Sequence, residues 1–175
     1  MHHTNNTMEK ITLQVDLDAV YERLFKESGY VARSRAAMGL SDQLADSITL
    51  TGDERPVIEK WITSCVNEIV HSMNRYLGPC SATHRRTGEN DAGQYAISVI
   101  APHNYPDGLA MPIKECIIDF IFYNTMQHWY TIIKPDEANI MAVHLQESAA
   151  RLRELLTQRK RPAKGYGKNE NVIEL

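Results

Sequence analysis

The sequence has no long apolar segment and no extreme of charge, and these absences narrow the class of protein. Its most apolar stretch, residues 113–126, contains three charged side chains, whereas a membrane-spanning helix needs about 20 mainly apolar residues. Charged residues make up 23% of the 175 residues and hydrophobic residues 43%, near the averages for globular proteins. We therefore expect one globular domain without a membrane-spanning helix.

Cysteines are few, and the first residues lack the features of a secretion signal. Cys65, Cys80 and Cys116 are widely spaced and odd in number, which favours free thiols over a disulfide framework. Cys65 and Cys116 also fall on apolar helical stripes, where a free cysteine is usually a small core residue. Residues 1–10 are polar and have no apolar core followed by small residues, so we expect a protein that is not secreted.

Local motifs for catalysis and metal binding are also missing. The sequence contains none of the patterns GxSxG, GxGxxG, GxxxxGK[ST], HExxH and CxxC. Cys80 and His84 are the closest mixed pair of metal ligands, and one pair cannot complete a site of four ligands. Carboxylate pairs such as Asp53 and Glu54 are explained by helix capping. We expect no enzymatic activity, no cofactor and no metal; the alternative is an enzyme whose catalytic residues are distant in sequence.

Four segments have the apolar periodicity of helices, and together they predict a mainly α-helical fold, a small bundle of about four helices. The segments run approximately over residues 16–38, 56–77, 112–133 and 135–161. The first can be capped by Asp16 or Asp18. The second has the best-marked start, because Thr51 or Asp53 can accept hydrogen bonds from the first turn and Pro56 is tolerated there.

Two shorter segments alternate apolar and polar residues, as half-buried strands do. Residues 94–101 predict a strand, and residues 10–15 predict either a strand or only a short extended arm. Residues 39–47 and 80–93 are rich in polar residues and predict loops. The expected organisation is an N-terminal arm, a helical domain with a short β-hairpin or strand insertion, and a C-terminal docking tail, at residues 1–15, 16–162 and 163–175.

Aromatic residues gather in the third predicted helix, and they have three interpretations. They are Phe120, Phe122, Tyr123, Trp129 and Tyr130. Their helical setting favours packing in the core, and a subunit interface comes next because aromatic residues are enriched there. A base-stacking platform would need cations around it, and only Lys114 and Lys134 are near.

Positive charge is concentrated near the end of a chain whose formal net charge is −3. Residues 151–168 carry seven cations and a single acid, Glu154. One interpretation is that the cations complement the C-terminal end of the fourth helix and continue into a solvated tail. The other is that this segment docks on a neighbouring subunit, a larger assembly or nucleic acid. The candidate docking residues are Arg159, Lys160, Arg161, Lys164, Tyr166, Lys168, Val172 and Ile173.

Two stretches, TGDERPVIEKW at residues 51–61 and the block from Trp129 to Pro162, resemble the head–tail connector, or neck ring, proteins of tailed bacteriophages and prophages. The likeness is one of layout and covers most of residues 10–162. It implies a virion structural protein without enzymatic activity, located in the neck and in the host cytoplasm during assembly. Its copies would form a homo-oligomeric ring between portal and tail, although tail-completion proteins have a similar layout.

The resemblance also implies a set of partners. The chain ends of such proteins reach neighbouring subunits, so the C-terminal segment would be a docking arm toward other copies, the portal, or tail and other neck proteins. The ring encloses the DNA channel, which would allow passing contact with DNA. The alternative is a small nucleic-acid-binding regulatory protein whose basic end binds phosphate. Against it, no predicted helix begins with base-reading residues on a basic face.

Overall fold

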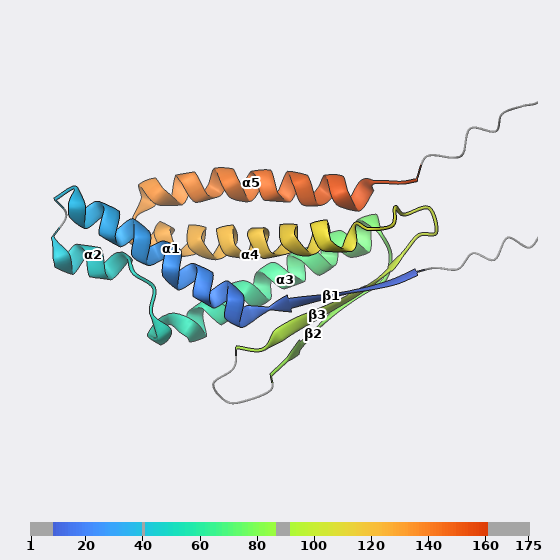
Figure 1. Ribbon diagram of the computed structural model, residues 1–175, viewed down its shortest axis with the longest axis horizontal. Coiled ribbons are helices and arrows are strands. Elements are labelled where there is room, and N and C mark those ends of the chain that lie inside the picture. The colour runs from blue at the N-terminus through green and yellow to red at the C-terminus, as the bar shows by residue number, and fades with distance from the viewer. Residues whose placement is uncertain (1–8, 40, 87–91, 161–175) are drawn as a thin grey trace, which may run out of the picture.

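The computed structural model describes residues 9–39, 41–86 and 92–160. Four long helices and a small antiparallel sheet make up a mainly α fold with a strand insertion, as predicted (Figure 1). The elements are, in order, β1 (Glu9–Asp16), α1 (Leu17–Ala37), α2 (Asp42–Ile48), the 3₁₀ turn η1 (Gly52–Glu54), α3 (Arg55–Tyr76), β2 (Cys80–Arg85), β3 (Gln94–Ala101), α4 (Ala110–Ile133) and α5 (Pro135–Thr157).

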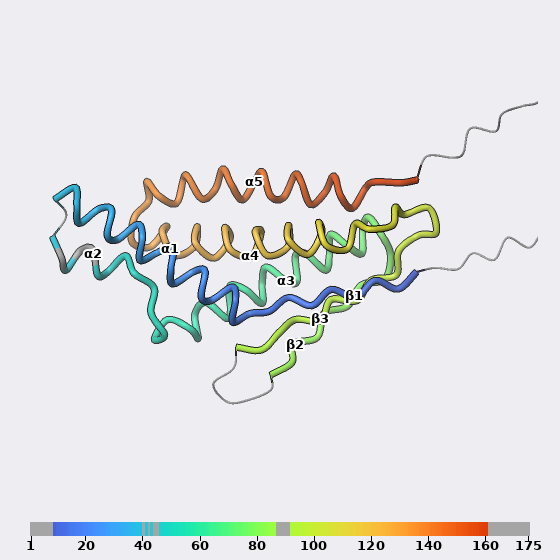
Figure 2. The backbone as a smooth tube through the Cα atoms, in the orientation of Figure 1, coloured from blue at the N-terminus to red at the C-terminus, as the bar shows by residue number. Residues whose placement is uncertain are grey.

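The helices lie in layers over one face of the sheet. Helices α3 and α4 contact the strands, and α5 packs along α4 on the side away from the sheet (Figure 1). Helix α1 continues directly from β1 and packs against α4 and α2. The backbone trace in Figure 2 is elongated, and the start of β1 and the end of α5 lie at the same end of it.

The sheet has the strand order β1-β3-β2, and both pairings are antiparallel. Ile97 of the central strand lies opposite Leu13 of β1 and Ala82 of β2. Tyr95, Ile97 and Val99 are buried on the helix-facing side, as their alternation predicts. Strand β1 confirms the strand prediction for residues 10–15, so this part of the expected arm belongs to the folded body. Residues 1–8 of the expected arm lie outside the described residues.

Two helices begin at capping residues that the sequence predicts. Asp16 caps α1, because its carboxylate accepts hydrogen bonds from the backbone N–H of Asp18 and Ala19. Thr51 and Glu54 form a reciprocal capping box at the start of η1, which leads directly into α3. The hydrogen bonds from Thr51 hold the pKa of the Glu54 carboxyl below its usual value. These contacts fix where α1 and α3 begin.

Two predicted loops are wrong in part. Residues 42–48 form α2. A contact with a distant residue stabilises it, because Ile48 is buried and its carbonyl accepts a hydrogen bond of 2.9 Å from the Trp129 indole. Residues 80–85 form β2, an edge strand whose backbone hydrogen bonds go to β3. Both segments are polar, and tertiary partners rather than local periodicity give them regular structure.

The buried interior matches other expectations. Cys65 and Cys116 are free thiols in the core, and Cys80 is a half-buried free thiol. Helix α4 contacts α1, α2, α3, α5 and β1, so it is covered on more than one side. Among the described residues, no helix has the length and apolar character needed to span a bilayer. Of the aromatic cluster, Phe122 and Tyr130 are buried and the other three rings are partly buried against the core, so core packing is confirmed.

Candidate docking site at the C-terminal end of the bundle

Two of the eight predicted docking residues, Arg159 and Lys160, are in the described part of the chain. The other six lie outside the described residues: Arg161, Lys164, Tyr166, Lys168, Val172 and Ile173. Arg159 and Lys160 follow α5 directly, and the contacts they make decide how the segment after residue 160 leaves the bundle.

Arg159 joins the C-terminal ends of two helices. Its guanidinium donates hydrogen bonds of 3.0 Å to the carbonyl of Leu156 in α5 and 2.6 Å to the carbonyl of Tyr76, the last residue of α3. It also donates to the carbonyl of Gln158 and lies over the Tyr105 ring at 5.8 Å. Because the last carbonyls of a helix have no partner within it, one cation here satisfies acceptors of both helices.

Lys160 fixes the chain to the loop between β3 and α4. Its Nζ lies 2.8 and 2.9 Å from the two carboxylate oxygens of Asp107, and its backbone N–H donates to the carbonyl of Asn104 at 2.6 Å. The same loop is tied to α5 by Tyr105, whose hydroxyl donates to the carbonyl of Leu155 at 2.8 Å. We call Arg159 and Lys160, together with the residues that accept their hydrogen bonds, the C-terminal anchor; these acceptors are Tyr76, Asn104, Asp107, Leu156 and Gln158.

The predicted end of the last helix is wrong by about one turn. The sequence placed Arg159–Arg161 in its final turn, whereas α5 ends at Thr157 and Gln158 has φ −59° and ψ 143°. The extended backbone at Gln158 lets Arg159 fold back onto the helix ends. The dipole interpretation of the cations therefore holds for Arg159, with the addition that it serves α3 as well as α5.

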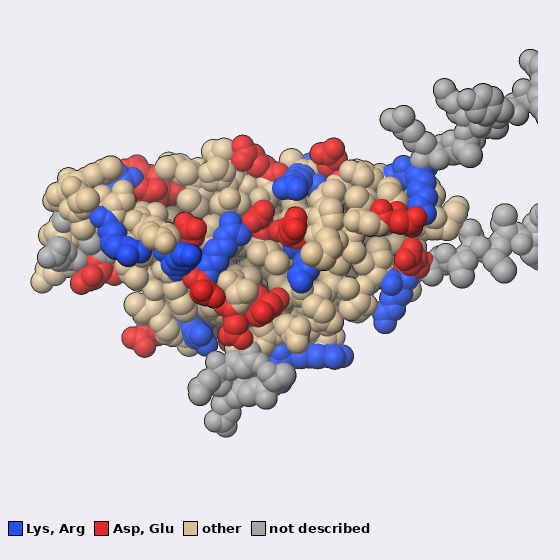
Figure 3. Space-filling model, viewed as in Figure 1, with Lys and Arg blue, Asp and Glu red and all other residues tan. Residues whose placement is uncertain are grey.

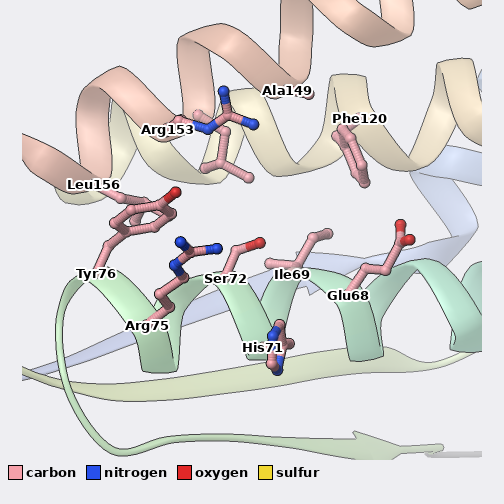
Figure 4. Close-up of a pocket in the computed structure, with 11 residues that line it drawn as sticks. Glu68, Ile69, His71, Ser72, Arg75, Tyr76, Phe120, Ala149, Arg153 and Leu156 are labelled. Atoms are coloured by element: carbon pink, nitrogen blue, oxygen red, sulfur yellow. The ribbon is translucent and has the colours of Figure 1, made fainter.

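A groove of about 320 Å³ opens between α3, α4 and α5 beside this anchor (Figure 4). Phe120 of α4 points into the space between α3 and α5, where the small side chains of Ser72 and Ala149 leave room for it. Other apolar side chains form the rest of the floor: Ile69, Tyr76, Leu152 and Leu156. This volume is at the lower end of the range of ligand pockets, about 300–1,000 Å³.

Two cations stand on opposite sides of the groove. Arg75 comes from the last turn of α3 and Arg153 from α5, and both are exposed (Figure 4). Within the described residues neither guanidinium has an ion-pair partner, although Arg75 lies over the Tyr76 ring. Sequence reasoning missed this pair as a site. The one available signal was the excess of cations from residue 151 onward, which includes Arg153 but not Arg75.

Of the seven exposed large apolar side chains among the described residues, five belong to the second half of α1 and the residue that follows it, the last turn of α4 and the first three turns of α5, toward the other end of the molecule; the other two are Val57 and Met111. Helices α1 and α4 end there, and α5 begins there (Figure 1). We call the following five residues the apolar end: Tyr30, Met38, Ile132, Ile140 and Val143. Charges on the face shown in Figure 3 are interspersed in sign, with no wide area of one sign among the described residues.

Cys80 and His84, the closest mixed pair of metal-ligand residue types in the sequence, each contact other groups in the structure. The described ranges contain no group of three or more His, Cys, Asp or Glu residues placed to hold a metal ion. His84 stacks on the Tyr95 ring at 4.7 Å, and its Nε2 lies 2.9 Å from the carbonyl oxygen of Ala92, so it has a structural setting. Cys80 points to Met73 and not to His84, with 3.9 Å between the two sulfur atoms.

Comparison of the chain with protein-family models, with curated proteins and with solved structures gives no match in any of the three.

Proposed function

We propose that this protein is a structural subunit of a tailed-phage or prophage virion, which forms an oligomeric ring in the neck between portal and tail. The observation that carries the proposal is the presence of two unlike surfaces at opposite ends of an elongated body. One is the apolar end, and the other is the C-terminal anchor, from which the basic segment continues. A closed ring needs one patch on each copy to meet a different patch on the next copy.

The C-terminal anchor supports a docking role for the segment after residue 160. Arg159 is hydrogen-bonded to Leu156 and Tyr76, and Lys160 to Asn104 and Asp107. These contacts fix the position at which the segment begins. A fixed root limits the volume that the segment searches, and this raises its effective concentration at a partner held beside that end. We infer that portal, tail or other neck proteins and neighbouring copies are its partners, with no catalytic role and no cofactor.

The nucleic-acid-binding alternative is weaker for the same reason. It requires the basic end to bind phosphate, whereas Arg159 and Lys160 bind oxygen atoms of the protein itself. Lys160 is paired with the carboxylate of Asp107, and the N–H groups of Arg159 are directed to carbonyl oxygens of the protein. The aromatic cluster is partly or fully buried and offers no open platform for bases.

A protein inventory of density-purified virus particles tests the proposal. Particles from an induced culture of the source organism are quantified by mass spectrometry against the major capsid protein. We expect the chain at a few to about a dozen copies per particle, as a closed symmetric ring requires. Its absence from particles that contain capsid, portal and tail proteins would overturn the proposal, and a steeply salt-dependent affinity for duplex DNA would then favour the alternative.

A further inference from the structure

The groove between α3, α4 and α5 has the features of a peptide-binding site. Its floor is apolar around Phe120, and its rim carries Arg75 and Arg153 toward the C-terminal anchor and the Glu68 carboxylate at the far end. A ligand that matches these surfaces has apolar side chains on one side and carboxylates nearby. Peptide segments with alternating side chains meet this requirement when they are extended.

The chain itself contains such a segment. Residues 170–175, ENVIEL, bring together apolar and acidic side chains. In an extended segment, Ile173 and Leu175 would fall on one side together with Asn171, and Glu170 and Glu174 on the other together with Val172. The first pair suits the floor of the groove, and the second pair suits the two arginines on its rim. The rim carries two cations against one carboxylate, so its net charge is opposite to that of the segment.

We propose that this groove binds the segment Glu170–Leu175 of a neighbouring copy of the chain. The identity of the partner rests on the proposed ring assembly, whereas the groove and its ligand rest on the contacts described here. Ile173 and Leu175 lie against Phe120 and Leu152, and Glu170 and Glu174 pair with Arg75 and Arg153. Phe120 and Tyr76 are the apolar groove residues that keep partly exposed rings in the free chain, and this segment covers them.

The direction of the described chain favours a neighbouring copy over the chain's own segment. Residues 158–160 continue past the end of α5 and away from the bundle (Figure 1), and Lys160 is held there by Asn104 and Asp107. The groove lies along α3 and α5, behind the point at which residue 160 leaves the end of α5. Residues 161–169, which join Lys160 to the bound segment, span roughly 30 Å when extended, and this length sets how far the groove of the neighbouring copy can lie.

Disulfide trapping between two full-length variants tests the proposal. One variant carries Ala149→Cys in the groove, the other carries Ile173→Cys, and both carry Cys80→Ser so that the remaining native thiols are buried. After the two are mixed and oxidised, we expect a covalent dimer whose yield rises with protein concentration. The matched control replaces Ala149→Cys by Lys26→Cys, an exposed position in the middle of α1 that lines neither the groove nor the apolar end, and gives no dimer above background.

Charge reversal provides the second measurement. Arg75→Glu with Arg153→Glu in the groove variant lowers the yield of dimer about tenfold, because two partly exposed charge pairs are lost. Glu170→Arg with Glu174→Arg in the Ile173→Cys variant restores the yield of dimer. A yield unchanged by both double variants would overturn the charge pairing that defines the proposed site.

Three outcomes separate this inference from the proposed function. A disulfide that forms only when both cysteines are in one chain, independently of concentration, assigns the groove to the chain's own segment and overturns the neighbour proposal. Trapping equal to that of Lys26→Cys, in copies that still sediment as a closed oligomer, overturns the groove as the binding site and leaves the ring proposal standing. Absence of the chain from virus particles overturns the ring proposal, whether or not trapping occurs.

Discussion

The guanidinium of Arg159 donates a hydrogen bond of 2.6 Å to the carbonyl oxygen of Tyr76, a residue 83 positions earlier in the chain. This contact joins the C-terminal end of α3 to the C-terminal end of α5 beside the groove. It makes Arg159 part of the folded body, although the sequence places it in a basic segment with the composition of a tail.

Replacement of Arg159 should destabilise the fold modestly. Arg159→Ala removes the hydrogen bonds to the carbonyls of Tyr76 and Leu156, and we expect the free energy of unfolding to fall by about 1 kcal/mol, less than for a buried site because the side chain is exposed. Urea unfolding followed by circular dichroism measures this difference. Arg151→Ala, on an exposed position of α5, is the matched control and should change the value by less than about 0.5 kcal/mol. Equal effects of the two variants would contradict a special role for Arg159.

Two truncations separate folding from assembly. Removal of residues 161–175 leaves the C-terminal anchor intact, so we expect unchanged unfolding and loss of the oligomer in sedimentation. Removal of residues 159–175 also deletes Arg159 and Lys160, and it should lower the free energy of unfolding by about 1–2 kcal/mol. A chain that ends at residue 160 and still joins virus particles normally would refute the docking role of the segment.

Two glycines should respond in opposite directions to the same added methyl group. Gly78 follows α3, and a Cβ there would collide with the carbonyl oxygen of Ile100, so Gly78→Ala should cost roughly 1–3 kcal/mol of unfolding free energy. Gly29 lies inside α1 with no heavy atom near its would-be Cβ, so Gly29→Ala should add about 0.5–1 kcal/mol. Thermal unfolding of both variants gives the signs. A stabilising Gly78→Ala would show that α3 and β3 are further apart than described.

Two tyrosines differ in the partner of their hydroxyl groups. The hydroxyl of Tyr130 is buried without a hydrogen-bond partner among the described residues, so Tyr130→Phe should leave stability unchanged or raise it by up to about 1 kcal/mol. The hydroxyl of Tyr105 donates to the carbonyl of Leu155, so Tyr105→Phe should cost about 1 kcal/mol. Paired urea titrations decide the order. A greater loss of unfolding free energy in Tyr130→Phe than in Tyr105→Phe would mean that the Tyr130 hydroxyl has a hydrogen-bond partner.

The thiol of Cys80 should be slow to ionise in the folded protein. Burial raises its pKa to about 11, from a usual value near 9. The neutral thiol is therefore favoured by folding, and the stability it contributes below pH 9 is lost as the pH rises from about 9 to 11. Iodoacetamide labelling at pH 8, followed by mass spectrometry, should be roughly a hundredfold slower in the folded than in the urea-unfolded protein.

Cys80→Ser identifies the labelled site. Cys65 and Cys116 are more deeply buried, and burial raises the pKa of both, so they should react only on unfolding. Rapid labelling of Cys80 in the folded protein at pH 8 would contradict its half-buried placement against Met73.

Strong local patterns made part of the fold predictable. Helix α3 keeps its apolar spacing for its whole length behind the Thr51 capping box, and β3 alternates without interruption from residue 94 to 101. In both elements the side chains that face the core repeat at the period of the backbone, so sequence alone fixes type and approximate bounds. The mainly helical class, the buried cysteines and the placement of the aromatic residues in the core follow from the same patterns.

Other features depended on partners that are distant in the chain. Strand β2 is polar and exists because β3 supplies its hydrogen bonds, and α2 is held by the Trp129 indole at Ile48. The groove needs Phe120, Arg75 and Arg153 from three helices, and no local motif brings these residues together. The sequence by itself determined a helical fold and a basic end. Only tertiary packing decided that Arg159 caps two helices and that a groove opens beside it. The positions of backbone carbonyls and the distances between helices depend on residues far apart in the chain, so no local sequence pattern predicts them.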